Sequence, residues 1–202
     1  MLTTDADLDG EVLTGDLSGQ SAANARFLEC TFQQCDLTEF RAPRARFSDC
    51  GLYAVHGAGV DLAESTWQDC VVQGARLGAV QLYGAEVRRV RFEGCKVEFL
   101  NLRGATLVDV QFVDCQLVEP DLAEARLTQV TFDGSRVVSA EFGRARMTDV
   151  DLSSAELVAP RGLSGLRSAT ISALQLIDLG PALAAELGIV VADPGRPGRP
   201  GG

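Results

Sequence analysis

The sequence contains one histidine, His56, and no long uninterrupted run of apolar residues. Because this histidine is alone and occupies a solvent-facing position of the repeat described below, a histidine-based triad and a multi-histidine metal site are excluded. A membrane-spanning helix needs about 18 consecutive apolar residues, and no segment approaches that length. No charged segment followed by an apolar stretch opens the chain, so we expect no secretory signal and a cytoplasmic location.

Other arrangements that carry catalysis or bind cofactors are missing too. The glycines fall mostly at corner positions of a repeat, and none forms a phosphate-binding loop ahead of a helix. Pairs of carboxylates such as Asp61 and Glu64 occur, but no pattern around them indicates a cleft. We therefore predict that the protein is not an enzyme and holds neither a metal nor a cofactor.

A five-residue repeat dominates what is present. Twenty-nine units follow one another without an insertion from Gly15 to Ala159. Nearly every unit has an apolar residue at its centre and a small residue two places earlier, as in Ala25 before Phe27. This period fits neither an isolated helix nor an ordinary strand, whereas self-similarity at a fixed spacing indicates a stacked solenoid.

All the cysteines occupy the small-residue position of this repeat, where alanine, valine and serine stand in other units. We therefore interpret them as small buried apolar residues rather than as a disulfide framework. Metal or redox chemistry is the alternative, but the cysteine spacings follow the repeat. The six residues are Cys30, Cys35, Cys50, Cys70, Cys95 and Cys115.

Equivalent large residues recur every twenty residues, which is four units. Four units per turn give each coil four sides, so equivalent residues lie directly above one another and form ladders in the core. Gly57 stands where leucine or phenylalanine is the rule, and we expect a thin or kinked corner there. One ladder is predicted from Phe32, Leu52, Val72, Phe92, Phe112, Phe132 and Leu152.

The unit Ala6-Asp7-Leu8-Asp9-Gly10, with its relaxed copies along the chain, resembles the pentapeptide-repeat family. The resemblance covers residues 15–159 and implies an all-β fold, a right-handed quadrilateral β-helix with four units per coil. It also implies that the central residue and its small partner point inward while the other three positions face solvent. Charged residues before several centres, such as Asp36 and Arg46, agree with this orientation.

We divide the chain into three parts. Residues 1–162 form the β-helix, with a regular register over 15–159 and a slip of one residue between Leu13 and Leu17. Seven coils at about 4.8 Å each make a rod about 34 Å long, whose ends need caps. Residues 163–192 form a module that caps the rod or dimerises. Residues 193–202 are rich in proline and glycine, and we expect them to be disordered.

The C-terminal module begins where Pro160 ends the register. Residues 181–187 predict a short helix with Pro181 in its first turn and Gly188 at its end. Residues 189–191 predict a brief strand. An extra coil in a new frame is predicted from the spacing of Leu166, Ile171 and Leu176, with Ala169 and Leu174 as their partners.

The formal net charge is −10, and residues 15–159 carry 21 acidic and 14 basic residues. Such a body repels nucleic acid and favours basic partners, so we expect no direct nucleic-acid binding and no membrane partner. On one side of the rod, the last position of each unit forms an acidic column that Arg89 and Gln129 interrupt. The acidic column consists of Glu29, Asp49, Asp69, Asp109 and Asp149.

This column has two interpretations. Arginines precede several unit centres on the same side, so one interpretation is a row of arginine–carboxylate pairs across each corner, which contribute little at a surface. The other is a linear negative track that a cationic DNA-binding groove binds in place of phosphates.

The acidic rod and the segments 165–171 and 181–189 resemble the fluoroquinolone-resistance pentapeptide proteins of actinobacteria. This resemblance implies that a C-terminal module joins two rods end to end, and that the dimer mimics B-form DNA and occupies the DNA-binding saddle of DNA gyrase. Capping of the last coil within one chain is the alternative role of the module. The predicted dimerisation residues are Leu174, Leu176, Ile177, Leu179, Leu183 and Leu187.

Two functions follow from these patterns. The first is a non-enzymatic DNA mimic that binds DNA gyrase and protects it from quinolones. The second is an interaction scaffold with another protein partner and no effect on gyrase, which binds through exposed apolar residues. That contact set is Tyr53, Tyr83, Phe99, Val118, Val138 and Val158.

Overall fold

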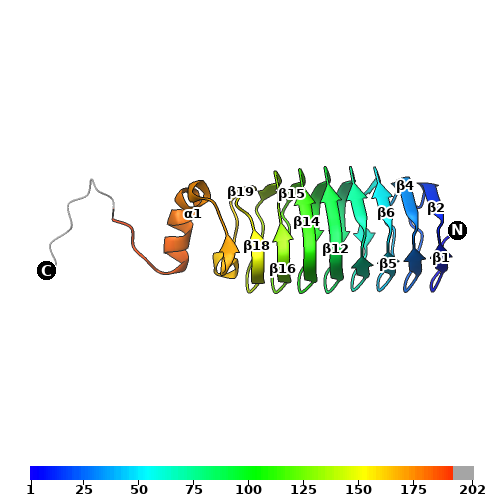
Figure 1. Cartoon of the computed structure of the whole chain (residues 1–202), viewed down its shortest axis with the longest axis horizontal. Coiled ribbons are helices and arrows are strands. Elements are labelled where there is room, and N and C mark those ends of the chain that lie inside the picture. Colours follow the sequence, from blue (N-terminus) through cyan, green and yellow to red (C-terminus); the bar gives the residue numbers. More distant parts are fainter. Residues whose placement is uncertain (193–202) are drawn as a thin grey trace.

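Parallel β-strands stacked in coils of twenty residues form the repeat region (Figure 1). The computed structural model describes residues 1–192. Neighbouring strands pair in register, so that Phe92 lies between Val72 and Phe112. The rings of Phe92, Phe112 and Phe132 are stacked at centroid distances of 4.9 Å. The predicted fourfold winding is confirmed, and the fold is an all-β quadrilateral solenoid with a short C-terminal helix.

Each coil has four faces, which we name A to D in chain order. Face A comprises residues 25–29 and the units stacked above them up to 145–149. Faces B, C and D start at residues 30, 35 and 40 and repeat every twenty residues. Face A holds β1 (Asp7–Asp9), β3 (Arg26–Leu28), β5 (Arg46–Ser48), β9 (Thr66–Gln68) and the first parts of β12 (Glu86–Glu93), β14 (Thr106–Val113), β16 (Arg126–Thr131) and β18 (Arg146–Asp151).

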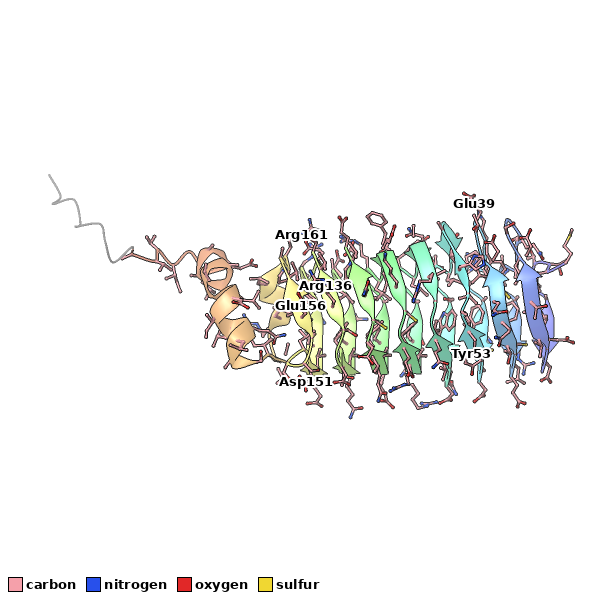
Figure 2. All side chains as sticks on the ribbon, turned by 90° about the horizontal axis from the view of Figure 1, so that it is seen from above. Glu39, Tyr53, Arg136, Asp151, Glu156 and Arg161 are labelled. Carbon is pink, nitrogen blue, oxygen red and sulfur yellow. The ribbon has the colours of Figure 1, made fainter. Side chains whose placement is uncertain are left out.

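Faces B and C are also β-sheets, whereas face D depends mainly on single β-bridges such as that between Asn101 and Asp121. Figure 2 shows Arg161 and Asp151 at opposite edges of the rod, with Arg136 and Glu156 between them. Face B holds β2 (Val12–Asp16), β4 (Thr31–Asp36), β6 (Gly51–Tyr53) and β10 (Val71–Gln73). Face C holds β7 (His56–Gly57), β11 (Arg76–Gln81), β13 (Lys96–Asn101), β15 (Gln116–Val118), β17 (Arg136–Val138) and β19 (Glu156–Val158), and face D holds β8 (Val60–Asp61).

The corners explain why the repeat has five residues. The last residue of most units adopts the left-handed backbone conformation, with φ of 54° at Asp49 and 51° at Arg89. This conformation turns the chain out of the strand direction, and unbranched polar residues tolerate it better than β-branched ones. A short extended segment therefore alternates with one turning residue, and the centre of each unit and its small partner both point inward.

The interior of the rod is apolar. Phe27, Phe47 and Trp67 stack on one another, and Ser65 satisfies the Trp67 indole by accepting its Nε1–H at 2.8 Å. All six cysteines are free and buried, which agrees with their interpretation as packing residues. Burial raises the pKa of the Cys30 thiol, so it stays protonated at neutral pH.

Gly57 forms the irregular corner that the sequence predicts. Its φ is 137°, and a Cβ atom there would lie 2.5 Å from the backbone nitrogen of Thr38. The strand β7 around it has only two residues. Farther along the rod, a cavity of about 50 Å³ has an entirely apolar lining that includes Trp67, Leu77 and Val97.

Both ends of the rod depart from the twenty-residue offset. Leu13 pairs with Phe32, nineteen residues away, and Asp16 pairs with Asp36 after an irregularity in β2. This is the one-residue slip that the sequence predicts. At the other end, the strand β20 (Ala169–Thr170) also pairs with β18 at an offset of nineteen residues.

The C-terminal module differs from its prediction. After the 3-10 helix η1 (Leu163–Leu166) and β20, the helix α1 spans Ala173–Glu186 and lies across the end of the rod (Figure 1). The predicted helix over 181–187 is thus too short, and Pro181 lies inside α1 rather than in its first turn. Leu174 and Leu176 belong to the helix, so the prediction of a coil that includes them is wrong.

The cause of this error is a capping box at the start of α1. The Ser172 hydroxyl accepts the Gln175 amide at 3.2 Å, and the Gln175 side chain accepts the Ser172 amide at 2.7 Å. These bonds satisfy free amides at the helix start. Gly188 ends the helix with a φ of 70°, as expected. Residues 189–191 form no strand, and the predicted disordered tail, 193–202, lies outside the described residues.

Candidate interaction surfaces

The acidic column lies along the edge between faces A and B. Its five members are corner residues with φ between 52° and 56°, so the backbone sets their direction and spacing. The coils place successive positions of the column about 4.8 Å apart. As the sequence predicts, Arg89 and Gln129 occupy the two remaining positions, both also left-handed.

The arginine–carboxylate pairs expected across each corner do not form. Among residues 1–192, Glu29, Asp49, Asp109 and Asp149 have no cationic atom within 4.0 Å. Within the described residues, Asp69 is the one member of the column that is paired, through a bond of 2.9 Å from Arg89 Nη2 of the next coil, and the hydrogen bonding by Arg89 lowers the pKa of Asp69.

Face A as a whole is electrically balanced. Its seven units from 25–29 to 145–149 contain six acidic and six basic residues. The arginines Arg26, Arg46, Arg126 and Arg146 stand before the unit centres, on the half of the face next to face D. The column is therefore a negative edge beside a positive one rather than part of a uniformly negative face.

A ring of negative charge runs around the rod in one coil of its middle part. The coil of residues 105–124 contains five acidic residues and no basic residue, whereas the preceding coil, 85–104, contains three acidic and five basic ones. The members of this ring share a coil and not a face, so the pattern along columns does not reveal it. Its carboxylates are Asp109, Asp114, Glu119 and Glu124 at the four corners, together with Asp121.

Ion pairs between coils reduce the charge of this ring on one side only. Arg103 lies 3.0 Å from Asp121 and 3.3 Å from Glu124, and Arg144 also pairs with Glu124. In the described part of the chain, Asp114 and Glu119 have no cationic atom within 4.0 Å.

The six residues predicted to dimerise fall into two groups. Leu179 is buried and Leu183 half-buried, so these two pack within the chain against the end of the rod. The other four project into solvent, with Leu174 75% and Ile177 71% exposed. The exposed group consists of Leu174, Leu176, Ile177 and Leu187.

Gln175 closes the end of the rod, a role that the sequence analysis missed. Its Nε2 donates to the carbonyl oxygens of Leu152 and Ala155, both at 2.7 Å. The last coil has no further coil to supply donors, so this side chain replaces them. The capping-box pattern of Ser172 and Gln175 was the signal available in the sequence.

The predicted apolar contact set is only partly continuous. Val118, Val138 and Val158 lie in register on β15, β17 and β19, each half-buried, and form a stripe on face C. Phe99 and Tyr83 are 52% and 44% exposed on other coils. Tyr53 does not join them, because its ring lies over Gly51 on face B.

The described residues show no conventional chemical centre. Within residues 1–192, no group of three or more His, Cys, Asp or Glu residues is placed to hold a metal ion. His56 is exposed, with Nδ1 3.8 Å from Asp36 Oδ1. Among the helices of this part of the chain, none has the length and apolar character needed to cross a membrane.

Comparison with known proteins places the chain in a family. Similar solved structures include HetL, a pentapeptide-repeat protein involved in heterocyst differentiation regulation from the cyanobacterium Nostoc, with 14% identity over 82% of this chain and 87% of HetL, at a TM-score of 0.40. QnrB1, a plasmid-mediated fluoroquinolone resistance protein, has 16% identity over 91% of this chain and all of QnrB1, at a TM-score of 0.37.

A pentapeptide-repeat protein of the Arabidopsis thaliana thylakoid lumen has 21% identity over 71% of this chain and 69% of its own, at a TM-score of 0.31. No curated protein matches the sequence significantly. The profile of the pentapeptide repeat region matches residues 25–102 and 85–159, which together make up more than half of the chain. The chain therefore belongs to the pentapeptide-repeat family.

Proposed function

We propose that this protein is a non-enzymatic acidic rod that binds DNA gyrase in the place of DNA and protects the enzyme from quinolones. Pentapeptide-repeat solenoids are generally structural or interaction proteins without catalytic activity. The observation that carries the proposal is the straight acidic column, in which only Asp69 has a cationic atom within 4.0 Å among residues 1–192. A cationic groove that binds DNA phosphates supplies the missing cations.

The spacing of the column is of the same order as that of the phosphates of DNA, although wider. Its positions repeat about every 4.8 Å, while each strand of B-form DNA has one phosphate about every 3.4 Å along the axis. The charge density is lower than that of DNA, so the affinity depends on a long contact and decreases with added salt. Gyrase acts on chromosomal DNA, and the proposal therefore includes a cytoplasmic location.

An end-to-end homodimer through α1 lengthens this contact. A helix that is apolar on all sides is normally buried, yet α1 exposes Leu174, Leu176, Ile177 and Leu187. Gln175 and Leu179 hold the opposite side of α1 against the rod, so the exposed side is presented on a fixed support. A second copy of the same helix is the partner that this surface fits.

Ultracentrifugation tests the dimer. In about 500 mM salt, Leu174→Asp combined with Ile177→Asp is expected to convert a dimer into a monomer, because the carboxylates lose hydration in the interface while charge-based contacts are screened. The matched control is Tyr83→Asp, an exposed apolar position on face D that lies far from α1 along the chain. A parental protein that is monomeric at micromolar concentration contradicts the end-to-end dimer.

A supercoiling assay tests gyrase binding. The parental protein is expected to inhibit gyrase or relieve its poisoning by a quinolone, and Asp49→Lys with Asp69→Lys is expected to weaken this effect at least about tenfold. Asp114→Lys with Glu119→Lys is the control, since it makes the same charge change at left-handed corners of faces B and C. Equal losses in both variants point to net charge alone, and no effect of the parental protein overturns the proposal.

The valine stripe on face C favours a second candidate function. Val118, Val138 and Val158 form a straight apolar strip whose members pair in register, and such a strip suits a flat protein partner. This scaffold function predicts that Val138→Lys abolishes partner binding in cells while the gyrase assay shows no effect with any variant.

A further inference from the structure

Face A has opposite charges along its two edges. The edge next to face D contains the residues before the unit centres, which we call the arginine edge, and the other edge is the acidic column. In three units an arginine on the first edge accompanies an acid on the second, and in the unit 85–89 the two charges are exchanged. These four units contribute Arg26 with Glu29, Arg46 with Asp49, Glu86 with Arg89, and Arg146 with Asp149.

The exchanged unit is the informative one. Arg89 interrupts the acidic column at the same coil where Glu86 interrupts the arginine edge. Either change alone would leave two like charges on opposite edges of this unit. The two changes together keep the edges opposite in sign.

These opposed charges do not satisfy each other within the chain. Arg26 pairs with Asp7 at 3.4 Å, and Arg89 pairs with Asp69. In the part of the chain that the structure describes, Arg46, Asp49, Arg146 and Asp149 have no oppositely charged atom within 4.0 Å. The register also places Arg26 next to Arg46 and Arg126 next to Arg146, and neighbouring like charges in a sheet are destabilising.

We propose that face A is a self-complementary interface through which two copies of the chain lie side by side with their rods parallel. A two-fold axis parallel to the rods exchanges the two edges and keeps every coil at its own level. The arginine edge of one copy then meets the acidic column of the other. Arg46 faces the partner's Asp49, Arg146 faces the partner's Asp149, and Glu86 faces the partner's Arg89.

An antiparallel arrangement does not give this match. A two-fold axis perpendicular to the rods brings each edge against the same edge of the other copy, so arginines meet arginines and acids meet acids. Like charges placed together oppose association. The charge pattern therefore selects the orientation of the two rods as well as the face.

The middle of face A allows the two copies to approach. Between the edges, the outward residues after the unit centres are uncharged except for Arg88, which stands near the proposed axis and lies 3.9 Å from Glu86. One face of a rod about 34 Å long is small, so the association belongs to the weak, salt-sensitive class. The uncharged central residues are Leu28, Ser48, Gln68, Val108, Thr128 and Thr148.

This interface goes beyond the proposed function and uses the same acidic column. A second copy on face A and a cationic groove of gyrase therefore exclude each other on that edge. The inference depends on neither gyrase binding nor α1, and its test removes the end-to-end contact from every sample.

Charge exchange provides the test, with the full chain carrying Leu174→Asp and Ile177→Asp as background. One variant has Arg46→Glu with Arg146→Glu, a second has Asp49→Arg with Asp149→Arg, and a third has all four changes. The corner position tolerates arginine, since Arg89 already occupies it with a φ of 51°. Association constants are measured by sedimentation in about 50 mM and about 500 mM salt, where screening differs strongly.

The background protein is expected to dimerise at low salt and to dissociate at high salt. The association constants of the first and second variants are each expected to fall at least about tenfold. A mixture of these two variants is expected to associate as the background protein does, and so is the third variant, which carries all four changes. Circular dichroism confirms that each variant is folded. Equal association of all variants, or a folded third variant that remains monomeric, overturns the proposal.

Cross-linking tests the orientation. Ser48→Cys is expected to form a disulfide with the same residue of the second copy under mild oxidation, because parallel rods place equal positions near the axis. Antiparallel rods instead place Ser48 opposite Thr128, so a cross-link only between Ser48→Cys and Thr128→Cys chains overturns the parallel arrangement. Arg88→Gln is expected to strengthen the dimer several-fold by removing the one like-charge contact at the axis.

Discussion

The body of the rod and its C-terminal module bury apolar residues in different ways. In the body, every coil covers the coil before it, and the phenylalanines at unit centres are buried except Phe92, which is partly buried. In the module, α1 covers the last coil with Leu179 and Gln175 but leaves Leu174 and Ile177 in solvent. A coil inside the rod has a neighbour on both sides that covers its apolar residues. A terminal element has a neighbour on one side only, so association with another molecule is expected at its other side.

The two ends of the rod differ from its middle in the register of strand pairing. Both end coils pair with their neighbours at an offset of nineteen residues rather than twenty. The middle coils are restrained from both sides and keep the regular register. An end coil has one restraining neighbour, so it accommodates a shorter connection.

The largest effect is expected in the body, where Phe112→Ala removes the middle ring of a stack. Phe112 is 2% exposed and lies between Phe92 and Phe132. The cavity left behind is expected to cost about 3–5 kcal/mol of unfolding free energy, measured by urea denaturation. The control Phe99→Ala, at an exposed corner, changes stability by less than about 1 kcal/mol. Equal losses would contradict the ladder as the main source of stability.

Gly57→Ala tests the irregular corner within the body. The new Cβ would lie 2.5 Å from the Thr38 backbone nitrogen, and a loss of about 1–3 kcal/mol is expected from the displaced backbone. Gly104→Ala is the matched control, because Gly104 has a φ of 65° and nothing within 4 Å of the built Cβ. Gly104→Ala should lose about 1 kcal/mol of unfolding free energy, which is the cost of alanine in the left-handed conformation. Similar losses at both sites would rule out the close approach as the cause.

Gln175→Leu breaks the contact between body and module. The carbonyls of Leu152 and Ala155 lose their donor, and the free energy of unfolding is expected to fall by about 1–2 kcal/mol. This is the low end of the range for unsatisfied buried acceptors, because the end of the rod is near water. Hydrogen exchange should accelerate in the last coil and not in the central coils. The control Gln116→Leu, on an exposed position of face C, should leave the free energy of unfolding and the hydrogen exchange of the last coil unchanged. An unchanged last coil would mean that α1 does not cap the rod.

Acid is expected to produce the smallest effect, at turns of the body. The Thr38 hydroxyl and amide donate to Asp36 at 2.6 and 2.8 Å, and these hydrogen bonds lower the pKa of Asp36. Because the folded-state pKa lies below the unfolded one, this stabilisation is present at neutral pH and disappears as pH falls through the folded-state value. The urea midpoint should therefore decrease below about pH 4.

The matched pair for this test is Asp36→Asn and Glu39→Gln. Asp36→Asn keeps an acceptor for Thr38 but removes the titrating group. The urea midpoint of this variant should therefore decrease less at acid pH than that of the parental protein. Glu39 is an exposed carboxylate at the next corner (Figure 2), and its replacement should retain the decrease of the parental protein. An identical acid response in both variants would contradict the role of Asp36.

Much of the fold could be predicted because its determinants are local and repeated. The period placed Phe92, Phe112 and Phe132 in one ladder, and the missing side chain at Gly57 marked the irregular corner. The helix boundary was predicted poorly because Pro181 suggests a first turn, whereas the capping box at Ser172 starts the helix earlier. Whether residues 163–192 act as one module stays a prediction.

The sequence by itself determined which residues share a face and a coil, since a constant period converts chain position directly into place in the rod. Only the tertiary structure decided which charges meet. Arg89 bonds to Asp69 of the neighbouring coil, while Asp49 has no cationic partner within residues 1–192. The physical reason is reach: the backbone period sets where each Cα lies, but long side chains choose among several neighbours according to local geometry and the orientation of the corner.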